Sequence, residues 1–150
     1  MATRKTPLVN GEYYHMFNRG VAKMQIFNNH FDYIRFFKTM VYYSIQGPKP
    51  KFSIFAPTTT ILDRNKKIVD IISYCLMPNH FHVLLKQIKE GGISEFASKI
   101  SNSYTKYFNI KNDRVGPIFQ GDFKSVHIEN TEQLNKYPRS KLTGYSEELL

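Results

Sequence analysis

The chain has 150 residues, of which 41% are hydrophobic and 15% aromatic, as expected for a single domain with a buried core. Lys and Arg outnumber Asp and Glu by 21 to 12, which gives a net charge of +9. No apolar run approaches the roughly 18 residues of a membrane span and no secretory signal is recognisable, so we expect a cytoplasmic protein with no membrane partner. The one cysteine, Cys75, favours a reducing compartment and lies in an apolar run that predicts a buried thiol.

Hydrophobic periodicity predicts six regular elements after a basic lead-in at residues 1–11. In chain order they are a strand at 12–20, a helix at about 29–46, strands at 67–77 and 80–88, a helix at about 93–107 and a strand at about 123–129. The two middle strands flank the turn signal Pro78–Asn79 and form an antiparallel hairpin. In the polar connector after the first helix, residues 51–55 and 58–62 are candidates for short edge strands.

The order strand, helix, strand, strand, helix, strand predicts an α+β fold, a ferredoxin-like four-stranded antiparallel sheet with both helices on one face. Neither an internal repeat nor a linker divides the chain, so we expect one domain over residues 1–150. Because this arrangement carries many unrelated functions, the fold by itself does not indicate what the protein does.

The positive charge favours a polyanionic partner, most often nucleic acid, over a merely basic surface. The chain contains 10 Tyr and 12 Phe, and several of these rings alternate with basic or amide residues, as in "NSYTKYFNIKNDR". Aromatic faces beside cations can stack unpaired bases while the cations hold phosphates. Most of the phenylalanines are nevertheless expected in the core.

Two of the five histidines, His80 and His82, stand one residue apart at the head of an apolar strand in "MPNHFHVLL". Residues i and i+2 of a strand share one face about 6.5–7 Å apart, so both rings could bind one metal ion, while Phe81 and Val83 would pack under the helices. The alternative is that ordinary hydrogen bonds satisfy both rings. His15 could face either this site or the core.

The segment "MPNHFHVLL" resembles the histidine–hydrophobic–histidine signature of the single-tyrosine HUH transposases, and in particular their IS200-like or REP-associated tyrosine transposase branch. "YYHMFNRG" is similar to the family's first strand, and "SYTKYFNIKNDRVGPIFQGDFKS" to its second helix and the loop and strand beyond. The resemblance extends over about residues 12–134. It implies recognition of hairpin DNA and cleavage of an adjacent single strand, with the histidine pair holding a divalent metal ion, Mg²⁺ or Mn²⁺.

In such enzymes a tyrosine hydroxyl attacks the backbone phosphate, which leaves a 5′-phosphotyrosine link and a free 3′-hydroxyl. The family's tyrosine lies on a helix in a segment like "RYIxxNP", and an Asn or Gln one helical turn later gives the third metal ligand. This chain reads "IENTEQLNKYPRSKL", so residues 130–150 are expected to lack that helix. Tyr137 lies nearest the expected position of the nucleophile, although Pro138 disfavours a helix there. Gln133 could supply a ligand oxygen.

The candidate DNA contacts are Asn18, Arg19, Tyr104, Lys106, Arg114 and Lys124. The first two match a polar pair in the family and could hold a phosphate, or could form a turn with a solvated arginine. Tyr104 and Tyr107, three residues apart on the second helix, would pack or contact DNA. Asp122 stands where relatives commonly carry Arg, which weakens the case for a phosphate contact there.

The resemblance thus implies a metal-dependent transposase domain that nicks and rejoins single-stranded or hairpin DNA, with a homodimer as one expected state. If the tyrosine helix is absent, the protein could bind hairpin DNA and an ion without cleaving DNA. The alternative from another class is a non-catalytic nucleic-acid-binding module of the same topology. A covalent protein–DNA adduct would distinguish the enzyme from the module.

Overall fold

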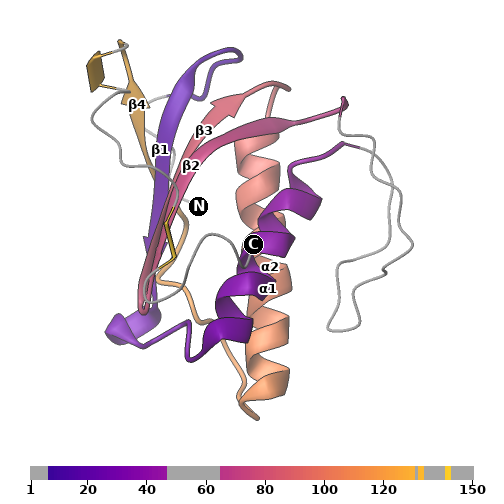
Figure 1. Ribbon diagram of the computed structural model, residues 1–150, viewed down its shortest axis with the longest axis vertical. Coiled ribbons are helices and arrows are strands. Elements are labelled where there is room, and N and C mark those ends of the chain that lie inside the picture. Colours follow the sequence, from indigo (N-terminus) through magenta and orange to yellow (C-terminus); the bar gives the residue numbers. More distant parts are fainter. Residues whose placement is uncertain (1–6, 47–64, 131, 134–140, 143–150) are drawn as a thin grey trace.

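The computed structural model describes residues 7–46, 65–130, 132–133 and 141–142, and the elements in these ranges follow the predicted order (Figure 1). They are β1 (Tyr13–Arg19), the short 3₁₀ helix η1 (Val21–Lys23), α1 (His30–Tyr43), β2 (Val69–Met77), β3 (His80–Gln87), α2 (Gly92–Lys111), β4 (Lys124–Ile128) and β5 (Lys141–Leu142). α1 ends ahead of the predicted boundary, and Ile45 already forms a β-bridge with Lys67. The candidate edge strands at 51–55 and 58–62 lie outside the described residues.

The strands form one sheet in the order β4-β1-β3-β2-β5, in which the first four are antiparallel neighbours. Both helices cover the same face of this sheet (Figure 1). The predicted ferredoxin-like α+β fold is therefore confirmed. β5 was not predicted: it pairs parallel to β2 through Cys75–Lys141 and Leu76–Leu142 and extends the sheet to five strands. Within the described ranges, neither helix combines the length and apolarity needed to cross a membrane.

The core lies between the sheet and the two helices, because strand alternation turns every second residue toward them. In β3, Phe81 and Val83 are buried on this side, as predicted. The ring centroid of Phe36 in α1 lies 5.0 Å from that of Phe81 and 5.1 Å from that of Tyr104 in α2. This packing joins both helices to β3. Because His80 and His82 alternate with Phe81 and Val83 along the strand, the two histidines point to the opposite face.

The start of α1 and the end of α2 are joined through one buried carboxylate, that of Asp32. Its side chain is 0% exposed and accepts hydrogen bonds from Lys111 Nζ at 2.7 Å, Tyr107 Oη at 2.8 Å and the Asn28 backbone N–H at 2.9 Å. Because two of these donors come from α2, the cluster ties the two helices together. It also engages the Tyr107 hydroxyl within the protein.

Replacing Asp32 by Asn removes the buried negative charge and leaves Lys111 without its counter-ion. We expect Asp32→Asn to lower the free energy of unfolding by about 2–3 kcal/mol. This is below the usual cost of breaking a buried pair, because the Lys111 side chain is 31% exposed and can be hydrated. The matched control is Asp70→Asn, since Asp70 pairs with Lys67 at an exposed site and its loss should cost less than about 1 kcal/mol. Urea unfolding gives both values, and equal destabilisation would contradict the prediction.

Candidate metal and nucleic-acid site

His80 and His82 lie on the face of the sheet turned away from α1 and α2, which we call the open face. Both are half-buried at the start of β3, and their ring centroids lie 5.1 Å apart with the ring planes at 87°. In the pairing of β1 with β3, His80 is opposite Arg19 and His82 is opposite Phe17. The motif therefore presents two neighbouring imidazoles on one face, as its spacing predicted.

The Pro78–Asn79 turn that introduces β3 is held by the segment after β1. The backbone N–H of Gly20 donates to the Asn79 carbonyl at 2.8 Å, and the N–H of Ile26 donates to the Pro78 carbonyl at 2.8 Å. A side chain at position 20 would place its Cβ against the Met24 carbonyl oxygen, inside van der Waals contact, so this close approach requires glycine. The chain thus wraps around the turn and fixes the strand end that carries the histidine motif.

The side chain of Asn79 determines which nitrogen of His80 carries the proton. Asn79 Oδ1 lies 2.8 Å from His80 Nδ1, and because an amide oxygen only accepts, the imidazole donates its Nδ1–H. The ring's lone pair is then on Nε2, the nitrogen that remains for a metal ion. In metal sites, a hydrogen bond from the other ring nitrogen is what orients a ligand histidine.

His82 has a different neighbour, the ring of His15 on β1. His15 Nε2 and His82 Nδ1 are 2.8 Å apart, and the two rings lie edge to edge, with centroids 4.9 Å apart and planes at 24°. Burial, reinforced by the charge of His82, lowers the pKa of His15 to about 4, and burial together with His80 lowers the pKa of His82. Both rings are therefore neutral near pH 7, the form in which imidazole binds metal ions.

His15 is the residue of this site that sequence reasoning left unplaced. Alternation along β1 puts it on the same face as Phe17, whose ring centroid lies 5.0 Å from that of His15 and 5.8 Å from that of His82. The signal that could have found it is strand alternation: residues 13, 15, 17 and 19 of "YYHMFNR" share one face of their strand, just as residues 80 and 82 share one face of theirs. That signal becomes decisive only when the two strands are known to be neighbours and their register is fixed.

The donor set fits a divalent ion held by two protein nitrogens, with its other positions left to water or phosphate oxygens. Across the described ranges, no group of three or more His, Cys, Asp and Glu side chains is arranged to hold a metal ion. Gln133 uses its Oε1 to accept the Glu129 backbone N–H at 2.6 Å. Cys75 is opposite His82 on the open face and is half-buried, so the prediction of a buried thiol is wrong.

Two of the predicted DNA contacts lie beside the histidines. Arg19 is exposed at the end of β1, opposite His80. Lys124 is exposed at the start of β4, opposite Phe17, so it belongs to the same cross-strand row as His82. Both cations lie on the β1 and β4 side of the imidazole pair, where they could hold phosphates.

Two other predicted DNA contacts are wrong, because their side chains are buried. Asn18 is 4% exposed; its Nδ2 donates to the Gly121 carbonyl at 3.1 Å, and its Oδ1 accepts the Arg19 N–H at 2.9 Å. Tyr104 is 0% exposed, and its hydroxyl donates to the Ile26 carbonyl at 2.6 Å. Burial raises the pKa of Tyr104, so this hydroxyl stays protonated. Both side chains bind backbone carbonyls and stabilise the fold.

The remaining predicted contacts lie away from the histidine pair. Lys106 is exposed on α2, in the helix layer. Arg114 follows α2 and donates to the carbonyls of Gly116 and Pro117 at 3.1 and 2.9 Å, which holds its own loop together. Tyr137 lies outside the described residues. The structure thus places the cations of β1 and β4, but not those of the helix layer, beside the motif.

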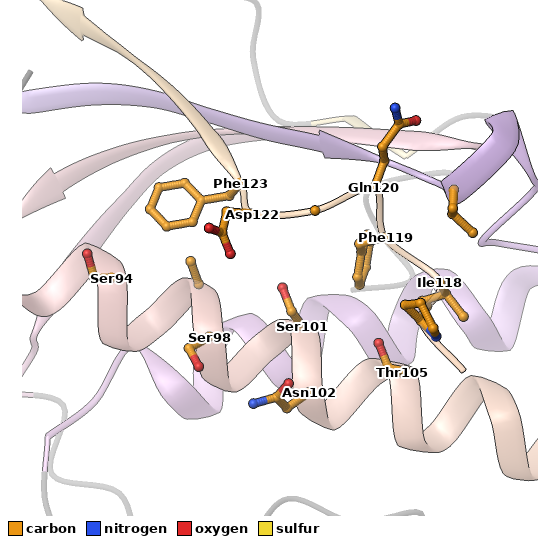
Figure 2. Close-up of a pocket in the computed structure, with 14 residues that line it drawn as sticks. Ser94, Ser98, Ser101, Asn102, Thr105, Ile118, Phe119, Gln120, Asp122 and Phe123 are labelled. Atoms are coloured by element: carbon orange, nitrogen blue, oxygen red, sulfur yellow. The ribbon is translucent and has the colours of Figure 1, made fainter. Parts of the chain in front are cut away.

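A cavity of about 1060 Å³ lies on the helix side, between α2 and the loop before β4 (Figure 2). Hydroxyl and amide side chains along α2 line it, namely Ser94, Ser98, Ser101, Asn102 and Thr105. Asp122 and Phe123 face them from the loop (Figure 2). Because neither Lys nor Arg is among the described residues that line it, this cavity lacks the charge needed to bind phosphate and is not part of the candidate site.

Comparison with known proteins identifies the class to which the fold and the site belong. Residues 60–137, more than half of the chain, match the family described as Transposase IS200 like, and the matched range includes His80, His82 and Tyr137. The protein therefore belongs to the IS200-like transposase family. No curated protein matches the chain.

The solved structures that share the fold include two transposases. A REP-associated tyrosine transposase bound to a REP hairpin is 15% identical in sequence, with a TM-score of 0.56 over 90% of this chain and 67% of that one. A candidate transposase from Deinococcus radiodurans R1 is 8% identical, with a TM-score of 0.53 over 89% of this chain and 92% of that one. At these identities the likeness establishes the fold alone.

The buried position of Asn18 makes it a residue of the fold and not of a DNA surface. We expect Asn18→Ala to lower the free energy of unfolding by about 1–3 kcal/mol, because the Gly121 carbonyl and the Arg19 N–H both lose their partner. The matched control is Gln120→Ala, since Gln120 is exposed and, among the described contacts, its side chain hydrogen-bonds only to the Arg19 side chain, so about 0.5 kcal/mol or less is expected. Thermal unfolding followed by circular dichroism compares the two, and an Asn18→Ala variant as stable as wild type would refute the assignment.

Proposed function

We propose that this protein is a metal-dependent transposase domain that nicks and rejoins single-stranded or hairpin DNA through a 5′-phosphotyrosine intermediate. Two imidazoles lie side by side on the open face, with Arg19 on β1 and Lys124 on β4 to one side of them, and this arrangement carries the proposal. Membership of the IS200-like family supports transposase activity. The REP hairpin bound by a transposase of similar fold supports hairpin DNA as the substrate.

The chemistry is a pair of transesterifications at phosphorus. In the first, a tyrosine oxygen forms a bond to the backbone phosphorus while the bond to the 3′ oxygen breaks. The tyrosine loses its proton and the departing 3′ oxygen gains one, which leaves a 5′-phosphotyrosine and a 3′-hydroxyl. In the second, a 3′-hydroxyl attacks this link and frees the tyrosine. Because one phosphodiester bond is exchanged for another, neither ATP nor hydrolytic water is required.

The residues of the open face take distinct roles in this reaction. His80 and His82 would hold the ion through Nε2, and Asn79 keeps the His80 lone pair on that nitrogen. A bound Mg²⁺ or Mn²⁺ would supply positive charge against the oxygens of the scissile phosphate. Arg19 and Lys124 would neutralise neighbouring phosphates and set the path of the strand across the sheet.

Tyr137 is the proposed nucleophile, because the family match extends to this residue. Among the described tyrosines, Tyr13 shares the open face, but it is opposite Lys86 toward the other end of β3. Tyr107 is bound to Asp32 in the helix layer. Tyr13 therefore serves as a control tyrosine on the same face.

A non-catalytic nucleic-acid-binding module is the second candidate function. It is favoured because the described residues provide no third His, Cys, Asp or Glu ligand for the histidine pair. Both functions require DNA binding on the open face, whereas only the transposase requires a covalent adduct. A homodimer is a further proposal, which size-exclusion chromatography with light scattering would test.

A hairpin DNA labelled at its 3′ end reports directly on the phosphotyrosine link, because the labelled fragment stays attached to the protein. With Mn²⁺, we expect wild-type protein to form an adduct that survives a denaturing gel. His80→Ala should reduce the adduct at least about 100-fold, because the phosphate loses its positioning. The matched control is His127→Ala, since the His127 ring binds Glu12 and contacts Tyr14 instead.

The same assay tests the nucleophile and the rival function. Tyr137→Phe should abolish the adduct, and Tyr13→Phe should retain it. DNA binding by wild-type protein that is indifferent to a chelator and gives no adduct would support the binding module and overturn the transposase.

Arg19 should contribute one phosphate contact to DNA binding. We expect Arg19→Ala to reduce the slope of log affinity against log salt by about 1, measured by fluorescence anisotropy in EDTA with a labelled hairpin. The matched control is Lys99→Ala, which removes an exposed cation of α2 that pairs with Glu95. A slope that falls in Lys99→Ala but not in Arg19→Ala would place the DNA on the helix layer and contradict the open-face site.

A further inference from the structure

The hydrogen bond between His15 and His82 links two strands through their side chains. His15 Nε2 and His82 Nδ1 are 2.8 Å apart, and the two ring planes differ by only 24°, which suits an N–H···N hydrogen bond in the plane of the rings. We propose that His15 is a positioning residue, which accepts the Nδ1–H of His82 and so keeps the His82 lone pair on Nε2, toward the cation. This role rests on the proposed function, in which both imidazoles hold a divalent ion.

The chemistry of imidazole requires such a partner. A neutral ring has one proton and one lone pair, so His82 can coordinate through Nε2 only when its proton is on Nδ1. That proton needs an acceptor, and His15 Nε2 lies within hydrogen-bonding distance of His82 Nδ1. The reverse polarity would put the His82 proton on Nε2 and block coordination there. The two polarities of one hydrogen bond are thus a binding and a non-binding state of the ring.

His80 and His82 obtain their acceptors in different ways. His80 donates to the side chain of Asn79, its neighbour in the chain, so this arrangement is local to the turn. The acceptor for His82 comes from β1, 67 positions away, and depends on the register of the sheet. The Phe17 ring lies against both His15 and His82 and limits their rotation. The position of the proton on the second ligand, His82, therefore depends on tertiary structure, through the hydrogen bond to His15.

Two substitutions separate the hydrogen bond from the packing. His15→Phe keeps an aromatic ring at this position but removes the acceptor, whereas His15→Gln restores an acceptor oxygen at a similar distance from the backbone. His127→Phe is the matched control, since His127 lies on β4 outside this cluster. Circular dichroism and thermal unfolding confirm that each variant is folded.

The first measurement uses metal-free protein and no DNA. Long-range ¹H–¹⁵N spectra of the imidazoles at pH 7.5 report which nitrogen of His82 carries the proton. We expect the Nδ1–H form in wild type, in His15→Gln and in His127→Phe, and a mixture of both forms in His15→Phe. A His82 that carries its proton on Nε2 in wild type, or that is unchanged in His15→Phe, would overturn the assignment.

The second measurement is Mn²⁺ affinity by isothermal titration calorimetry. His15→Phe should weaken binding about 10–100-fold, and His15→Gln should recover most of that loss. Equal affinity in wild type and His15→Phe would overturn the positioning role. If wild-type protein binds no Mn²⁺, the proposed metal-dependent function fails, while the spectra of the metal-free protein still decide whether His15 sets the protonation of His82.

Discussion

β1 and β3 lie next to each other at the centre of the sheet, and the register of their backbone hydrogen bonds determines which side chains meet at the histidine motif. With Arg19 opposite His80, the ring of His15 comes within hydrogen-bonding distance of His82. A shift of one residue would turn every side chain of β1 to the other face. It would also expose Met16, which is fully buried against the helices. The core therefore enforces the register, and the register assembles the site.

The two faces of the sheet have different roles: the helix side holds the core, and the open face carries the candidate site. On the helix side, aromatic packing around Phe36 and the Asp32 cluster hold α1, α2 and the sheet as one layered body. On the open face, the side chains that could act on DNA are half-buried or exposed and are supported from behind by that body. This arrangement lets polar and titratable groups gather on a rigid surface without placing unpaired charge in the core.

The positions of the Lys and Arg side chains indicate which surface of the protein would bind DNA. The net charge of +9 indicates a polyanionic partner but does not place it. Arg19 and Lys124 share the face of the imidazoles, whereas Arg114 is engaged with the carbonyls of its own loop. The cavity beside α2 has neither Lys nor Arg among the described residues that line it. A transposase and a simple binding module would share this surface. What separates them is a tyrosine brought to the phosphate, and family membership favours the transposase.

Local periodicity was sufficient to predict the ferredoxin-like order of elements and the shared face of His80 and His82, because repeats of 2 and 3.6 residues are properties of the backbone. The same periodicity puts Asn18 in phase with the buried Met16 and Tyr104 in phase with the buried Ile100. It could not show that each polar group would find a backbone carbonyl to bind, that of Gly121 for Asn18 and that of Ile26 for Tyr104. The contact of His15 with His82 depended on how two distant strands align. Sequence alone thus determined the motif and the fold class, whereas the tertiary structure decided which partners the motif has, because hydrogen bonds between strands are settled only when the whole sheet packs.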